Sequence, residues 1–195
     1  MIKLEDCKKV IEYRIMNDGP IETCQELCNE LMALQAERAV KYKDILAAMN
    51  FSNRLKPSFE AAPERFLLVA FDGGKAVGYV FSSTEVVTDE VYEQRPDWTS
   101  AFTKDSHWIY PDDLARPFKI GELVNLYIKP EYRGLHIGGY FMNEAMAWLH
   151  SREGLDRLMV YVSNGNNPGS LYEKYGFHRS FDVLDGMITA YSQKP

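Results

Sequence analysis

The most informative stretch of this chain covers residues 132–142 and reads Tyr132-Arg133-Gly134-Leu135-His136-Ile137-Gly138-Gly139-Tyr140-Phe141-Met142. It follows an apolar, strand-like run and continues into an amphipathic helical pattern. A glycine-containing turn before a helix lets the backbone approach a ligand, and the first N–H groups of the helix have no partner within it. The helix dipole favours anions at the same place. With Arg133 adding a positive charge, the stretch predicts a phosphate site.

Two other glycine-rich phosphate motifs do not fit this stretch. A Walker loop ends in Gly-Lys-Ser/Thr, which is absent here. The dinucleotide fingerprint needs two glycines separated by one residue soon after an early strand, and Gly134, Gly138 and Gly139 lack that spacing. The remaining alternative is structural: the glycines permit a tight turn and bind nothing.

The composition predicts a single globular domain over residues 1–195. Apolar residues make up 46% of the chain and aromatic residues 13%, which is enough for a substantial core. The net charge of −6 argues against a nucleic-acid partner, which would select a basic face. The start of the chain has no continuous apolar run and no segment reaches bilayer length, so we expect a cytoplasmic protein without a membrane partner.

The cysteines do not indicate a disulfide framework. Cys7, Cys24 and Cys28 are odd in number and crowded near the start of the chain. Cys24 and Cys28 lie one helical turn apart, which would allow a metal or redox role, but no histidine cluster completes such a site. We therefore interpret them as small buried hydrophobic residues and expect no metal.

Hydrophobic periodicity outside the turn predicts an α/β domain. Strands are predicted at residues 13–16, 65–71, 76–81, 120–128, 157–162 and 187–191. Helices are predicted at residues 21–39, 43–49, 138–152 and 170–175, with an irregular segment at 51–57. The strand–helix–strand unit over 120–162 implies parallel pairing. We expect one mixed, twisted central sheet with helices on both faces.

Residues 85–118 differ from the rest and are interpreted as an insertion or long functional loop. Between residues 85 and 113, eight residues are acidic, two are basic and five are aromatic. Two interpretations stay open, a wall attractive to a cationic amine or a solvated loop whose aromatic residues pack on the domain. The residues concerned are Asp89, Glu90, Glu93, Asp97, Asp105, Asp112, Asp113, Tyr92, Trp98, Trp108 and Tyr110.

Three features follow one another along the chain: the strand that ends in residues 126–132, the Arg133–Gly139 turn with its helix, and Leu171–Phe177. In this order they resemble the GNAT superfamily of acyl-CoA-dependent N-acyltransferases. The resemblance implies a single domain whose sheet is splayed where CoA enters. It also implies transfer of an acetyl group from acetyl-CoA to a primary amine by direct attack in a ternary complex, and allows a homodimer. The rival interpretation is a non-catalytic acyl-CoA-binding sensor or interaction module.

The resemblance assigns CoA-binding positions. The family loop is written Arg/Gln-x-x-Gly-x-Gly/Ala, and Arg133, His136 and Gly138 occupy the marked positions. His136 departs from the pattern and is accommodated if its backbone angles suit an L-residue; we interpret it as a loop residue over the phosphate region. The resemblance implies that the pyrophosphate of CoA is bound by Arg133, Gly134, Leu135, His136, Ile137, Gly138 and Gly139. It also implies that the pantetheine arm pairs with the backbone of Leu126, Tyr127 and Ile128.

Glu122 is the candidate general base. It lies eleven residues before Arg133, where some GNAT members carry a catalytic glutamate, and partial burial would raise its pKa. The alternative is an exposed strand residue or an ion-pair partner. Strict alternation places Val124, Leu126 and Ile128 on the face of Glu122 and places Leu123, Asn125 and Tyr127 on the other, unless a bulge intervenes. Because the family splays this strand, Asn125 could also reach the substrate.

Tyr172 is the candidate general acid, because it matches a tyrosine that many members place near the CoA sulfur. Its alternative is a core tyrosine packed on the sheet. One of Asn164, Asn166 and Asn167 is expected to contact CoA; the spacing does not decide among them, and Asn167 is favoured. Polyamines, aminoglycosides, amino-acid amines and protein amines all stay open as acceptors.

Overall fold

The computed structural model describes residues 10–167 and 169–195, so Cys7 lies outside the described residues. A seven-stranded sheet has the order β1-β2-β3-β4-β5-β7-β6. Its strands are β1 (Ile11–Ile15), β2 (Glu64–Asp72), β3 (Lys75–Val87), β4 (Phe118–Ile128), β5 (Arg157–Ser163), β6 (His178–Val183) and β7 (Ile188–Gln193). Only β4 and β5 pair in parallel within this sheet. The predicted mixed sheet is confirmed, and β6 is a strand that the sequence patterns did not predict.

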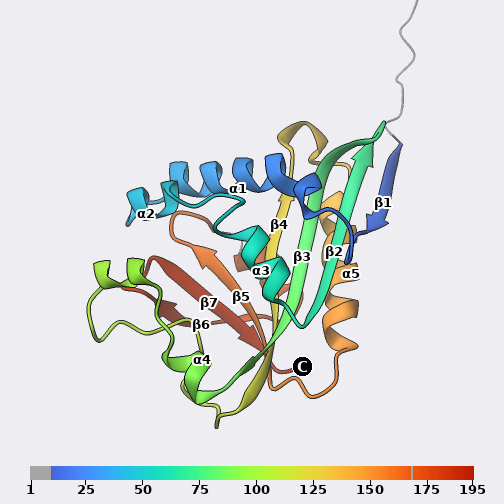
Figure 1. Cartoon of the computed structure of the whole chain (residues 1–195). Coiled ribbons are helices and arrows are strands. Elements are labelled where there is room, and N and C mark those ends of the chain that lie inside the picture. The colour runs from blue at the N-terminus through green and yellow to red at the C-terminus, as the bar shows by residue number, and fades with distance from the viewer. Residues whose placement is uncertain (1–9, 168) are drawn as a thin grey trace, which may run out of the picture.

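Helices cover both faces of the sheet, as predicted (Figure 1). α1 (Gln25–Arg38), which continues a 3-10 turn at Ile21–Cys24, lies with α3 (Leu55–Ala61) on one face, and α5 (Ile137–His150) lies on the other. The shorter helices are α2 (Lys43–Ala47), α4 (Asp89–Glu93) and α6 (Gly169–Glu173), with 3-10 turns at Asp97–Ala101 and Pro130–Tyr132. The irregular segment predicted at 51–57 was partly wrong, because α3 begins inside it; Pro57 fits the first turn, where backbone N–H groups have no helical partner.

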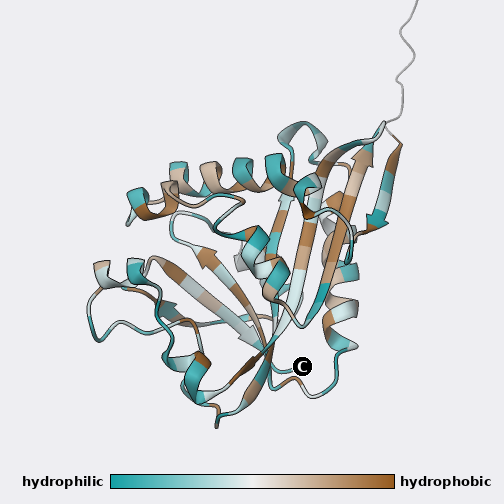
Figure 2. Ribbon diagram, in the orientation of Figure 1, coloured by the Kyte–Doolittle hydropathy of each residue, from teal (hydrophilic) through white to brown (hydrophobic). Residues whose placement is uncertain are grey.

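A hydrophobic core lies on each side of the sheet. Leu27 and Leu55 pack with Phe81 under α1 and α3, whereas Phe141 and Leu149 of α5 pack on the other face. Figure 2 shows hydrophobic residues along the central strands, while α1 alternates between hydrophobic and hydrophilic residues.

The interpretation of Cys24 and Cys28 as buried hydrophobic residues is confirmed. Both thiols are fully buried and free in the first core. Burial raises the pKa of Cys24 to about 12 and also raises that of Cys28. Since the reactive form of cysteine is the thiolate, both are inert near neutral pH.

The segment predicted to be an insertion connects two strands that pair with each other. Strands β3 and β4 stay paired up to Val87 and Phe118, so the connection between them, here called the insertion, comprises residues 88–117. Its aromatic residues Phe102, Trp108 and Tyr110 are buried in a third core with residues of β6, β7 and their turn.

Three of the seven acidic residues of the insertion pair with basic side chains outside that core. Asp89 pairs with Arg116 and Asp113 with Arg157, while Asp112 lies 2.9 Å from His107. The solvated loop with packed aromatic residues therefore describes the insertion better than an acidic wall.

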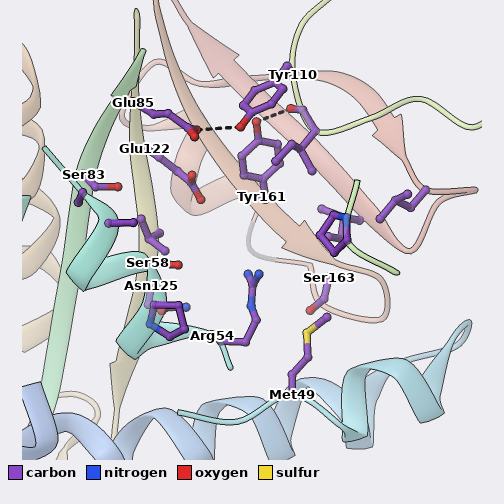
Figure 3. Close-up of a pocket in the computed structure, with 18 of the residues that line it drawn as sticks. Met49, Arg54, Ser58, Ser83, Glu85, Tyr110, Glu122, Asn125, Tyr161 and Ser163 are labelled. Carbon is purple, nitrogen blue, oxygen red and sulfur yellow. Dashed lines mark hydrogen bonds between the residues drawn. The ribbon is translucent and has the colours of Figure 1, made fainter. Parts of the chain in front are cut away.

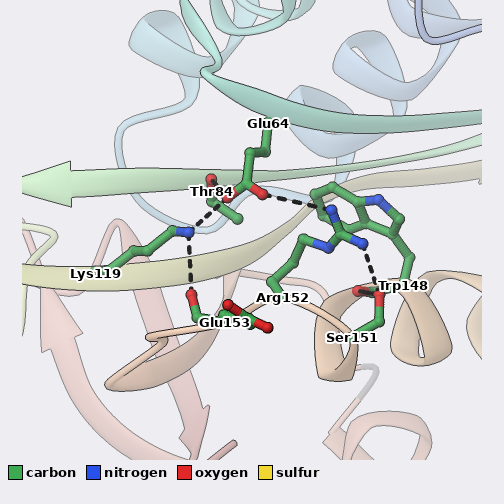
Figure 4. A network of polar contacts seen from close by, with 7 residues as sticks. All are labelled: Glu64, Thr84, Lys119, Trp148, Ser151, Arg152 and Glu153. Atoms are coloured by element: carbon green, nitrogen blue, oxygen red, sulfur yellow. Dashed lines mark hydrogen bonds and ion pairs between the residues drawn. The ribbon is translucent and has the colours of Figure 1, made fainter.

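A polar network joins the end of α5 to strands β2 to β4 (Figure 4). The Glu64 carboxylate accepts hydrogen bonds from Lys119 at 2.6 Å and from Thr84 at 3.0 Å, and it lies 3.4 Å from the Arg152 guanidinium. Arg152 also lies over the Trp148 ring at 5.1 Å. This network fixes the C-terminal end of α5 on the sheet.

Candidate active site

A β-bulge in β4 sets the direction of the side chains at the site. Phe81 of β3 pairs with Asn125, but the next residue, Ser82, pairs with Leu123, so Val124 is an extra residue on β4. An extra residue reverses the alternation beyond it. Glu122 and Asn125 thus line the same cavity, whereas Leu126 and Ile128 pack on the α5 side. The strict alternation was wrong for this reason, and the exception made for a bulge is confirmed.

The sheet splays at the same place. β4 and β5 pair from Ile120–Arg157 to Leu123–Val160 and no further, although both strands continue. Beyond Leu123, the edge of β4 that faces β5 is unpaired along Leu126, Tyr127 and Ile128. The predicted splay is therefore present, and it exposes backbone N–H and C=O groups of the strand that leads to the glycine turn.

A cavity of about 440 Å³ lies on the α1 and α3 side of this splay (Figure 3). Val124 and Asn125 of β4 and Tyr161 and Ser163 of β5 contribute to its wall, so the cavity spans both arms of the splay. Its apolar lining comes from α1, α2 and the insertion together with the β6–β7 region. These residues are Met32, Leu46, Met49, Trp98, Trp108, Ile109, Leu184 and Ile188.

Two carboxylates lie at one end of the cavity. Glu122 pairs across the strands with Ser83, two residues before Glu85 on β3. Burial raises the pKa of Glu122 to about 7; the Arg54 guanidinium opposes this shift and the Glu85 carboxylate adds to it. Burial also raises the pKa of Glu85, whose carboxylate accepts a hydrogen bond from the Tyr110 hydroxyl at 3.0 Å. About half of the Glu122 carboxyl groups are therefore ionised near neutral pH, and the ionised form is the one that can accept a proton.

Sequence reasoning missed Glu85, Tyr161 and Arg54. The sequence did carry a signal for Glu85. If side chains keep alternating along β3, Glu85 lies on the same face of the sheet as Tyr79 and Phe81. Tyr161 lies on the predicted strand of β5 and donates a hydrogen bond to the Ile109 carbonyl. Arg54 precedes α3 in a segment that the sequence predicted to be irregular, so nothing in the pattern indicated its direction.

The glycine turn has the geometry of an anion site. Gly134 has a φ of 82° and His136 a φ of 60°, both in the left-handed region, and α5 begins at Ile137. The backbone N–H groups of Ile137, Gly138 and Gly139 make no hydrogen bond to any residue that the structure describes. A Cβ atom placed on Gly139 would meet nothing within 4 Å. Three backbone donors at the positive end of α5 are therefore without a partner among the described residues.

The backbone angles of His136 do not suit an ordinary L-residue, which was the condition for accommodating it. They lie in the left-handed region that glycine prefers. Histidine is among the residues that enter the left-handed region more often than most. The family's preference for glycine at this position thus has a backbone cause. The Arg133 side chain is exposed, and its Nε donates to the Ile128 carbonyl at 3.2 Å.

Two side chains anchor the turn to the rest of the domain. Lys129, at the end of β4, is buried and pairs with Glu26 and, at 2.9 Å, with Glu30, both on α1. The Tyr132 hydroxyl donates to Asp72 of β2 at 2.7 Å. The turn is thereby fixed between α1 and the end of the β2–β3 hairpin.

Tyr172 does not line the cavity. It lies on α6, partly buried against Phe177 and Tyr191 with ring centroids 6.3 and 6.2 Å away. Burial, with a smaller effect of Tyr191, raises its pKa to about 12, so its hydroxyl stays protonated near neutral pH. Tyr172 thus has the packing role that was the alternative to catalysis. Its role as a proton donor stays a prediction.

The three asparagines differ in what binds their side chains. Asn164 accepts from the N–H groups of Val40 and Lys41 at 2.7 Å and donates to two carbonyls, so it is fully used. Asn166 bonds Ser163 and Arg38. The Asn167 side chain makes no hydrogen bond within residues 10–167 and 169–195. The amide oxygen and the NH2 group of Asn167 are thus both free, so Asn167 stays the favoured candidate for a contact with CoA.

Residues 10–167 and 169–195 contain no group of three or more His, Cys, Asp or Glu side chains placed to hold a metal ion. In the same part of the chain, no helix has the length and apolarity needed to cross a membrane.

Comparisons with known proteins place the chain. Residues 29–177 match the family described as "Acetyltransferase (GNAT) family". The mycothiol acetyltransferases of Salinispora arenicola and Geodermatophilus obscurus are each 35% identical, over 74 and 77 residues, which cover 37% and 38% of this chain. The aligned parts span only 24% and 25% of those two proteins.

Solved structures share the fold. The PaiA N-acetyltransferase of Thermoplasma acidophilum, solved in complex with coenzyme A, is 21% identical with a TM-score of 0.59, covering 95% of this chain and 99% of that one. A GCN5-related N-acetyltransferase of Ralstonia eutropha is 21% identical with a TM-score of 0.57, covering 89% and 96%. The splayed sheet, the glycine turn and the family match over residues 29–177 agree: this chain belongs to the GNAT acetyltransferase family.

Proposed function

We propose that this protein transfers an acetyl group from acetyl-CoA to the primary amine of a small molecule or peptide. The observation that carries the proposal is the position of Glu122: a half-buried carboxylate with a pKa near 7 in a cavity that spans the splay between β4 and β5. A base poised near the operating pH is what removal of a proton from an ammonium group needs. The family supports the reaction class.

CoA would lie along the splay, with its pyrophosphate on the glycine turn. The free N–H groups of Ile137, Gly138 and Gly139 fit phosphate oxygens, and the Arg133 side chain adds a charge that is exposed at the turn. The unpaired edge of β4 at Leu126, Tyr127 and Ile128 offers backbone groups to the amide-containing pantetheine arm. The free amide of Asn167 is a further candidate contact.

The chemistry requires three proton transfers, two from the amine nitrogen and one to the sulfur. Glu122 accepts the first proton from the ammonium group, directly or through water, and the amine nitrogen then attacks the thioester carbonyl carbon. The C–N bond forms and the C–S bond breaks, the sulfur leaves as a thiolate, and the nitrogen loses its second proton to solvent to give the neutral amide. Tyr172, protonated near neutral pH, would donate the proton that converts the thiolate to free CoA. A backbone N–H of the splayed β4 edge would stabilise the carbonyl oxygen as it gains charge.

Thiol release from acetyl-CoA tests this proposal. The purified protein is incubated with acetyl-CoA and a panel of polyamines, aminoglycosides, amino acids and short peptides, and CoA-induced thermal stabilisation is read in parallel. Amine-dependent thiol release with an acetylated product is the expected result. Stabilisation by CoA without turnover of any amine would instead favour the non-catalytic acyl-CoA sensor, and no stabilisation at all would overturn the CoA site.

A further inference from the structure

The cavity carries opposite charges that approach one space from different elements. Figure 3 shows the Glu122 carboxylate and the Arg54 guanidinium extending into the cavity toward each other, with Glu85 beyond Glu122. Glu122 and Glu85 lie on strands of the sheet, whereas Arg54 is the residue that precedes α3. The cavity therefore has an acidic side at the sheet and a basic side at the start of α3.

Arg54 has no ionic partner in the part of the chain that the structure describes. Its guanidinium makes no hydrogen bond or ion pair there, while nearby Arg65 and Lys56 are both paired, with Asp18 and Glu22. The guanidinium presents a planar set of donors that matches a carboxylate. An unpaired arginine directed into a cavity is thus available to a ligand.

The cavity wall suits a compact ligand with an apolar part. Three segments around the cavity are tied together: Asn164 holds the backbone of residues 40 and 41, and Asp185 accepts from Thr103 at 2.6 Å and from Tyr42 at 3.2 Å. These contacts join the α1–α2 connection, the insertion and the β6–β7 turn. Beside them, Leu46, Trp98 and Leu184 supply apolar surface, and the volume of about 440 Å³ is that of a small-molecule site.

From this arrangement we infer that the acyl acceptor is a free amino acid with an apolar side chain, its amine facing Glu122 and its carboxylate bound by Arg54. The inference deepens the proposed function and rests on it for the catalytic outcome. Arg54 then selects acceptors by their carboxylate, and Leu46, Trp98 and Leu184 contact the side chain. A polyamine, which carries no anionic group, would leave the arginine unpaired and repelled.

Matched acceptor pairs test the inference. Leucine, methionine and phenylalanine are each compared with the corresponding amino-acid amide, which keeps the amine and side chain and lacks the carboxylate. Both thiol release and thermal stabilisation without acetyl-CoA are measured for the wild-type protein and for Arg54→Gln. Arg14→Gln removes the same charge from the exposed surface of β1, away from the cavity, and is the control.

We expect the wild-type protein to prefer each acid over its amide by about tenfold or more in kcat/KM, the size of a hydrogen-bonded charged contact. Arg54→Gln should bring the ratio close to one, Arg54→Lys should restore part of it, and Arg14→Gln should leave it unchanged. Turnover of amides and acids at equal rates would overturn the inference and leave the acyltransferase intact. If no amine is turned over, the proposed function fails; equal stabilisation by acids and amides would then overturn the inference as well.

Discussion

Glu122 and Asn125 lie on the same side of β4 although they are three residues apart along the strand. A regular strand would place them on opposite faces. The bulge at Val124 removes that opposition, and the β4–β5 pairing ends at the residue just before it. One extra residue thus directs the carboxylate and the amide into one cavity at the point where the sheet opens.

The ionisation of Glu122 should cost stability as pH rises. Its pKa in the folded protein, about 7, lies above its usual value of 4.5, so the folded state binds the proton more tightly than the unfolded state between these values. The stability is fully present below pH 4.5 and is lost as pH rises through 7, by at most about 3 kcal/mol. Glu122→Gln removes this loss, so we expect the variant to gain stability relative to wild type between pH 5 and pH 8, measured by urea unfolding. A pH-independent difference would show that Glu122 is solvated like a surface carboxylate.

Tyr172→Phe should separate catalysis from binding. The ring packs on Phe177 and Tyr191, contacts that phenylalanine keeps, so the fold and CoA affinity should be unchanged. Loss of the hydroxyl should lower kcat about 100-fold if it protonates the thiolate. The measurement is thiol release at saturating acetyl-CoA, with CoA affinity determined by calorimetry. Wild-type kcat in the variant would remove Tyr172 from the mechanism and leave it a packing residue.

His136→Gly should keep both the fold and the CoA site. The left-handed φ of 60° costs an L-residue about 1 kcal/mol, and glycine removes that cost while raising the entropy of the unfolded chain by a similar amount. We expect a change within about 1 kcal/mol for glycine and a larger loss for His136→Val, which is β-branched. Unfolding in urea and CoA titration check both. Weaker CoA binding in the glycine variant would show that the imidazole itself contacts the ligand.

The Glu64 network should stabilise the protein at pH values above the pKa of the Glu64 carboxyl group. Lys119, by its hydrogen bond, lowers the pKa of Glu64, so the stabilisation is present above the usual value of 4.5 and disappears as pH falls. Glu64→Gln should lose about 1 kcal/mol at pH 7 and nearly nothing at pH 3. Glu12→Gln, which breaks the exposed pair with Arg14, is the matched control and should change little. Equal losses in the two variants would mean that the network acts as ordinary surface pairs.

The sequence predicted the parts of this site that depend on local chemistry. The turn at 133–139 and its helix, the strand that carries Glu122, and the parallel unit after it all follow from glycine placement and apolar period. What could not be predicted depends on contacts distant in sequence: the bulge at Val124 becomes visible only through pairing with β3. The direction of Arg54 likewise depends on how α3 packs against the sheet. β6 was missed because its exposed residues show little of the apolar alternation of a buried strand.

The pH dependence of acetyl transfer by wild type and Glu122→Gln tests the central claim most directly. With an amine identified by the thiol-release panel, the wild-type kcat/KM should rise with pH as Glu122 loses its proton, with a midpoint near 7. Glu122→Gln should be slower by about 100-fold or more and should lack that rise. A variant that retains the wild-type rate and the same rise near pH 7 would contradict the account, because the proton would then be accepted by another group.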